Sequence, residues 1–194
     1  MRFIRLAAAL CIALIATACL PVTSTVPIGS SIGFKPDPAL VGMWKGHGES
    51  PSETTYLSFF PQDDGTITAL MVTPDGKDTG WSAFSLQTAT LGANHFMNAH
   101  EVLSDGKPAS DEDAQKTFPL LYRVNGDGAL VIYLLDEKKA AAAIHAGKIA
   151  GTIEPGNFGD VAITAQASDL DAFMQTPDGR ALFVKPLAIF KREK

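Results

Sequence analysis

The chain has 194 residues, of which 46% are hydrophobic, 19% are charged and 8% are aromatic, and its net charge is −5. This composition is too apolar for a disordered protein and too acidic for a protein that binds nucleic acid, and the length suits one domain. Without the first 18 residues, which carry Arg2 and Arg5 and no acid, the net charge becomes −7. Such a surface does not favour anionic lipid or phosphate, so membrane association needs another feature.

The N-terminus supplies that feature. Residues 1–19 read MRFIRLAAALCIALIATAC, a basic start followed by an apolar run over residues 6–16 and then by small residues. The run is shorter than the roughly 20 residues that span a membrane and is typical of a signal peptide. The final Ala-Thr-Ala-Cys is similar to the bacterial lipobox, whose cysteine becomes the first mature residue and carries a lipid. We expect a signal peptide over residues 1–18 and lipid attachment at Cys19.

The cysteine count agrees with this interpretation. Cys11 lies inside the apolar run and would be removed, so Cys19 is the one cysteine that the mature chain keeps. A free thiol is a liability in an oxidising compartment, and a thioether-linked lipid removes that liability. Leu20 is not the aspartate that retains such lipoproteins at the inner membrane, so the resemblance implies an outer-membrane lipoprotein facing the periplasm. Cleavage by ordinary signal peptidase, which gives a secreted protein, remains the alternative.

Two further regions follow the signal peptide. Residues 20–38 are rich in Pro, Gly, Ser and Thr and have neither helical nor strand periodicity, which predicts a flexible tether after the anchor at residue 19. Fully extended, it would reach about 60 Å from the membrane. Residues 39–194 are expected to form one barrel-like domain.

Most of that domain alternates short apolar segments with turn signals. The expected strands cover residues 41–49, 55–60, 66–73, 79–88, 95–103, 118–124 and 129–135. Asp-Gly pairs at residues 64–65 and 75–76 tolerate the positive φ of tight hairpins. Consecutive hairpins predict an antiparallel meander, and closure into a barrel would remove its exposed edges. A barrel of about eight strands has room for a filled core or for one small ligand.

The last third adds two short helices. Asp136 is the expected N-cap of a helix over residues 137–146, and Ser168 begins a second helix, with Asp171 in a variant capping box. Strands are expected over residues 149–154 and 161–165, between the helices. The sequence Pro177-Asp178-Gly179 ends the second helix, and a final strand covers residues 181–192 with an interruption at Pro186. The fold class is therefore mainly β.

Two ends of this domain resemble the lipocalins. Gly42-Met43-Trp44 at the start of the first strand is similar to the opening Gly-x-Trp of that family, and a helix precedes the last strand in both. The resemblance implies a lipocalin-like barrel in which Trp44 plugs one end and a basic residue of the final strand, Arg192, lies across the indole. The middle of the chain also resembles uncharacterised lipoproteins of Gram-negative bacteria. These resemblances imply an architecture and do not imply an activity.

The sequence has no recognisable catalytic or metal-binding motif. His47, His95, His100 and His145 do not form a chelating pattern, and His95 and His100 point to opposite faces of one expected strand. Neither a nucleophile signature nor an EF-hand spacing occurs, so no enzyme activity, cofactor or metal is expected.

The aromatic residues suggest a binding role instead. Tyr56, Trp81, Phe84, Phe96 and Tyr122 lie on expected strands and could line a pocket for a small apolar ligand, although strand alternation sends some of them to the other face. We expect a non-enzymatic, lipid-anchored envelope protein that holds or passes such a ligand. The alternative is an envelope structural or assembly protein that docks a protein partner and has no ligand cavity.

Overall fold

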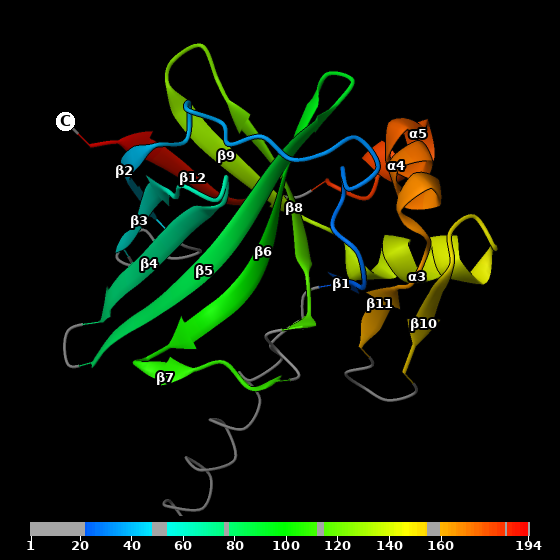
Figure 1. Cartoon of the computed structure of the whole chain (residues 1–194), viewed down its shortest axis with the longest axis horizontal. Coiled ribbons are helices and arrows are strands. Elements are labelled where there is room, and N and C mark those ends of the chain that lie inside the picture. Colours follow the sequence, from blue (N-terminus) through cyan, green and yellow to red (C-terminus); the bar gives the residue numbers. More distant parts are fainter. Residues whose placement is uncertain are drawn as a thin grey trace, which may run out of the picture.

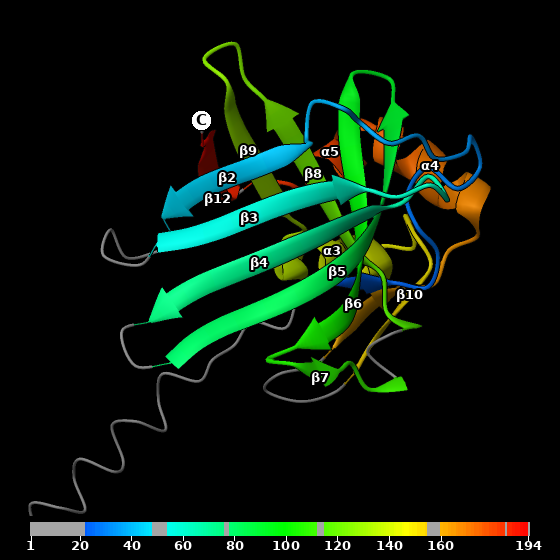
Figure 2. The same cartoon turned by 60° about the vertical axis from the view of Figure 1, so that its left-hand side comes forward.

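The fold is built around a closed antiparallel barrel (Figures 1 and 2). The computed structural model describes residues 22–47, 54–75, 78–111, 115–154, 160–184 and 186–193. Its barrel strands are β2 (Gly42–His47), β3 (Thr54–Pro61), β4 (Ile67–Asp75), β5 (Asp78–Leu91), β6 (Asn94–Ser104), β8 (Phe118–Val124), β9 (Ala129–Leu134) and β12 (Pro186–Arg192).

Each barrel strand pairs antiparallel with the next one in this order, and β12 pairs with both β9 and β2. This ring of eight strands confirms the predicted meander and its closure, which leaves no long edge unpaired. A short extra strand, β7 (Lys107–Pro108), pairs with β6 at the rim.

A smaller unit packs against the outside of the barrel. Between β9 and β12 the chain forms α3 (Glu137–His145), β10 (Gly151–Ile153), β11 (Val161–Ile163), α4 (Ala167–Gln175) and α5 (Pro177–Arg180). β1 (Thr23–Ser24) runs parallel to β11 and completes a three-stranded sheet. The barrel side chains Phe96 and Leu121 point outward into the core of this unit, where Leu170 and Met174 also lie. The unit therefore covers one side of the barrel, on the right of Figure 1.

Helix α3 begins with the expected N-cap, whereas helix α4 does not. Asp136 accepts a hydrogen bond from the Lys139 amide at 3.0 Å, as an N-cap does. α4 instead begins after Gln166, whose side chain makes no capping bond. Asp171, the expected capping partner, is buried and binds another segment. Helix α4 is therefore positioned by packing and not by a capping box.

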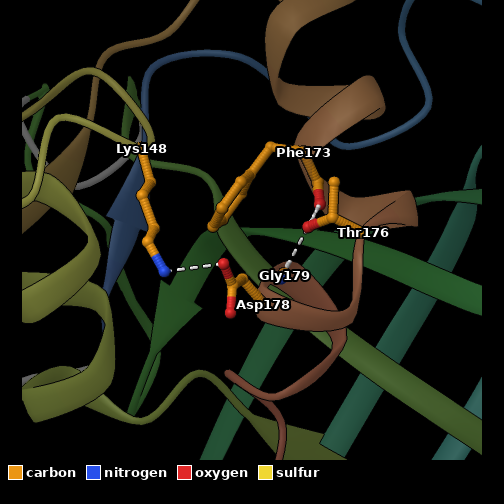
Figure 3. A network of polar contacts seen from close by, with 5 residues as sticks. All are labelled: Lys148, Phe173, Thr176, Asp178 and Gly179. Carbon is orange, nitrogen blue, oxygen red and sulfur yellow. Dashed lines mark hydrogen bonds and ion pairs between the residues drawn. The ribbon is translucent and has the colours of Figure 1, made fainter.

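A third helix appears where the sequence predicted only a stop. Thr176 accepts a hydrogen bond from the Gly179 amide at 3.1 Å, and Pro177 occupies the first helical position, where its missing N–H costs nothing (Figure 3). Asp178 forms an exposed ion pair with Lys148 at 2.7 Å. The last strand consequently begins at Pro186 and not at residue 181.

The expected tether also differs from the structure. From Val22 onward the chain packs on the domain, and residues 25–41, here called the strap, run from β1 over one end of the barrel to β2 (Figure 1). The Ile28 backbone exchanges hydrogen bonds with the Asn98 side chain, both at 2.8 Å. Asp171 accepts hydrogen bonds from the amides of Gly29 at 2.6 Å and Ser31 at 3.0 Å. Buried partners far along the sequence thus fix a segment whose own composition is that of a linker.

Candidate functional site

The barrel interior has two layers that differ in burial. The layer at the strap end is packed, and its buried side chains are Leu40, Trp44, Leu57, Phe59, Ile67, Ala69, Leu86, Met97, Ala99, Tyr122, Leu130, Ile132 and Phe190. We call it the closed-end layer. Side chains in a barrel alternate between interior and exterior, so the next inward residues along each strand form a second layer toward the opposite end.

Trp44 and Arg192 lie together in the closed end. The two residues are opposite each other across β2 and β12, and the guanidinium carbon of Arg192 is 4.3 Å from the centroid of the Trp44 ring. Trp44 is fully buried, and its indole N–H donates to the Leu40 carbonyl at 2.7 Å. Arg192 also donates to the carbonyls of Ala39, at 2.6 Å, and Val41. The strap and the last strand are therefore joined across the indole, which seals this end.

A second strap contact lies beside the plug. The Tyr122 hydroxyl donates to Asp37 Oδ2 at 2.7 Å, and the His95 ring is tilted against the Tyr122 ring with centroids 5.6 Å apart. Burial and the adjacent Asp37 carboxylate raise the pKa of Tyr122 above its ordinary value. The phenol therefore stays protonated at neutral pH and keeps its hydrogen bond to the strap.

The second interior layer is half-buried, and we call it the mouth layer. Its inward-facing residues are Thr55, Met71, Thr73, Ser82, Phe84, Glu101, Phe118, Leu120, Leu134 and Ala188. Five of these apolar side chains pack on the closed-end layer beneath them. Because Trp44 and the strap seal the other end, solvent reaches these inward side chains through the end that the mouth layer lines. The layer therefore offers apolar surface to a molecule that enters from this end.

The structure does not bring the five expected pocket residues together. Phe84 lies in the mouth layer, and Tyr122 lies in the packed closed-end layer. Tyr56 is on the outer face, where the Lys45 ammonium is 5.7 Å from its ring centroid, and Trp81 is paired with Val72 on the same outer face.

Phe96 points outward and packs under the helices, with its ring centroid 5.7 Å from that of Phe183. The pocket expectation is thus wrong for Tyr56, Trp81 and Phe96. The reason is strand alternation, because each of these residues has the parity of the outer face.

Sequence reasoning missed the polar groups of the mouth layer. Thr55 and Thr73 face each other across β3 and β4, with hydroxyl oxygens 3.2 Å apart. Glu101 is the charged residue of the layer and lies directly opposite Phe84 in the pairing of β5 with β6. The alternation Met97, Ala99, Glu101 is a signal in the sequence that could have placed this carboxylate inside.

The histidines do not assemble a site in the described part of the chain. His95 faces the barrel end, while His100 points outward and lies 3.4 Å from the Thr117 hydroxyl. His145 is exposed at the end of α3, and the side chain of His47 lies outside the described residues. Over the ranges that the structure describes, no three metal-ligating side chains come together, and no helix is long and apolar enough to cross a membrane. Cys19 and the expected signal peptide lie outside the described residues.

Comparison with protein-family models, with curated proteins and with solved structures found no match for this chain.

Proposed function

We propose that this protein is a lipid-anchored protein of the cell envelope that holds a small apolar ligand in the mouth layer and catalyses no reaction. The observation that carries the proposal is the contrast between the two interior layers. A closed-end layer of buried side chains gives the barrel a rigid core, while the layer above it leaves Met71, Phe84 and Leu120 half-buried and facing inward. Ligand sites in proteins combine such apolar walls with a few polar groups.

The depth of the mouth layer limits the size of the ligand. Each of β4, β5 and β8 contributes two inward positions to the layer, which corresponds to about 7 Å of strand. An apolar group about six carbons long, or a single aromatic ring, fills that depth. Burial is worth about 0.8 kcal/mol per methylene before the entropic cost of binding, so affinity for a simple alkyl chain should be modest.

The packing of the chain from Val22 onward supports the envelope part of the proposal, because it limits how far the domain can lie from its anchor. Val22 is only 3% exposed and belongs to the core of the smaller unit. Two residues separate it from Cys19. The three residue-to-residue steps from Cys19 to Val22 span at most about 11 Å when fully extended. A lipid on Cys19 would therefore hold the domain at the membrane surface, where apolar molecules are concentrated.

The ligand proposal is tested by filling the mouth layer. Ala188→Phe places a ring among the inward side chains of that layer, whereas Leu187→Phe places the same ring on the outer face of the same strand. 1-Hexanol, whose chain matches the depth of the layer, should bind the unaltered protein and Leu187→Phe but not Ala188→Phe in an NMR titration. Equal affinity of the two variants for 1-hexanol, or no binding to the unaltered protein, would contradict the proposal.

A second candidate function, docking of a protein partner, is favoured by the outer face of the barrel. Met43 and Phe60 are about half exposed on neighbouring strands, and Leu187 and Ile189 are equally exposed on β12. A photo-crosslinking amino acid at position 60 should then capture one discrete partner in cells, while the same probe at exposed Lys138 should not. Identical patterns at the two positions would eliminate this candidate.

A further inference from the structure

One ionisable side chain lies among the apolar groups of the mouth layer. Met97 and Ala99 belong to the closed-end layer, so Glu101, two residues further along β6, faces inward as well. It is half-buried. The other polar side chains of the layer, Thr55, Thr73 and Ser82, are neutral and come from β3, β4 and β5.

Two aromatic rings flank this carboxylate. Phe84 lies directly opposite Glu101 on β5. Phe118 lies on β8 opposite Ala99, which makes it the diagonal neighbour of Glu101 on the other side. Directly opposite side chains have Cβ atoms about 5 Å apart, and diagonal ones are within reach of an aromatic ring. Both rings face inward and are half-buried.

The carboxylate has no protein partner in the described ranges. Among the described residues, none donates a hydrogen bond to Glu101 or forms an ion pair with it. The Coulomb attraction between a carboxylate and a cation is stronger where water is partly excluded, as it is around a half-buried side chain. A cation bound beside Glu101 would also lie near two aromatic rings, and the faces of such rings attract cations.

We infer that the ligand is an amphiphile with an organic ammonium group, and this inference rests on the proposed function. The ammonium lies at Glu101 between Phe84 and Phe118, and the apolar part reaches toward Met71 and Leu120. An anionic head group is disfavoured because it would face the Glu101 carboxylate. The mouth layer thus selects the charge of its ligand at one residue and the length of its apolar part by depth.

The test compares three probes with the same six-carbon chain, namely hexyltrimethylammonium, 1-hexanol and hexanoate. Dissociation constants are measured by NMR titration of the purified protein, of Glu101→Gln and of Asp169→Asn. Asp169 is exposed on α4, so its substitution removes one negative charge away from the barrel interior. We expect the unaltered protein and Asp169→Asn to bind the ammonium about tenfold more tightly than the alcohol, and to bind hexanoate most weakly.

In Glu101→Gln the preference for the ammonium over the alcohol should fall to the part that the two aromatic rings supply, while the affinity for the alcohol stays unchanged. An unchanged preference in this variant, or no preference in the unaltered protein, overturns the inference and leaves the proposed function standing. Failure of all three probes to bind overturns both. Thermal unfolding of Glu101→Gln at the temperature of the unaltered protein shows that the variant is folded.

Discussion

The two tryptophans show that the position of a residue along its strand decides whether its side chain is buried inside the barrel. Trp44 and Trp81 both lie in barrel strands, but Trp44 is fully buried against the strap and Arg192, whereas Trp81 is half-buried on the outer face. The indole of Trp44 has a hydrogen-bond partner, the Leu40 carbonyl, as a buried Trp N–H requires. An indole therefore forms part of the packed barrel core at position 44, whereas at position 81 it lies on the outer surface of a strand.

Trp44→Ala should lower the free energy of unfolding by about 3 to 5 kcal/mol, because it leaves a large cavity in the closed-end layer and removes the surface on which Arg192 lies. Trp81→Ala should cost about 1 to 2 kcal/mol, because its side chain is partly hydrated already. Urea unfolding measures both values. Equal losses, or a loss below about 1 kcal/mol for Trp44→Ala, would show that Trp44 does not plug the barrel.

For single residues, the contact between two side chains was easier to predict than the face of a strand on which a side chain lies. The family resemblance of Gly42-x-Trp44 implied a contact between Trp44 and Arg192, and the structure places these two residues in contact. The aromatic residues of β3 illustrate the opposite case. Tyr56, Phe59 and Phe60 fall on both faces of the strand, so hydrophobicity alone could not tell which face is inside.

At the scale of elements, the strap is the part that local sequence could least predict. Its residues suit a linker, and the groups that fix it, Asn98 and Asp171, lie 70 and 140 or more residues away. The barrel strands were predictable because alternation and turn residues are local signals. The strap is ordered by long-range partners that leave no local pattern, and Asp171 was assigned to a capping box for the same reason.

Asp171→Asn should loosen the strap. The carboxylate accepts from Gly29, from the Ser31 amide and from the Ser31 hydroxyl, and an amide group would turn an NH₂ toward one of these donors. Leaving a buried donor unsatisfied costs about 1 to 3 kcal/mol. Hydrogen exchange should accelerate at residues 28–33 in this variant and remain unchanged in Asp169→Asn on the same helix. Unaltered exchange in Asp171→Asn would mean that the carboxylate does not hold the strap.

At the scale of the whole molecule, the barrel, the smaller unit and the N-terminus are connected through β1. β1 pairs with β11 of the smaller unit, and Ser24 bridges to Thr117, immediately before β8. Phe118, the first residue of β8, belongs to the mouth layer. The N-terminal chain therefore meets the domain near the mouth, so a lipid on Cys19 would place the mouth closer to the membrane than the strap-covered end.

The anchor can be tested separately from the ligand. Cys19→Ala should move the protein from the membrane fraction to the soluble fraction, because it removes the sulfur that would carry the lipid. Cys11→Ala is the matched control and should leave the distribution unchanged, since that residue lies within the expected signal peptide. A Cys19→Ala protein that still sediments with membranes would contradict lipid anchoring at this residue.

The difference between the two interior layers is tested most directly by methyl NMR during titration with 1-hexanol. If the mouth layer holds apolar ligands, the methyl signals of Met71, Leu120 and Leu134 shift with one common dissociation constant. The methyl signals of Leu57 and Leu130, in the packed closed-end layer, stay in place. The proposal is contradicted if the mouth-layer signals do not move at saturating alcohol, or if the shifts gather on the outer face at Leu187 and Ile189 instead.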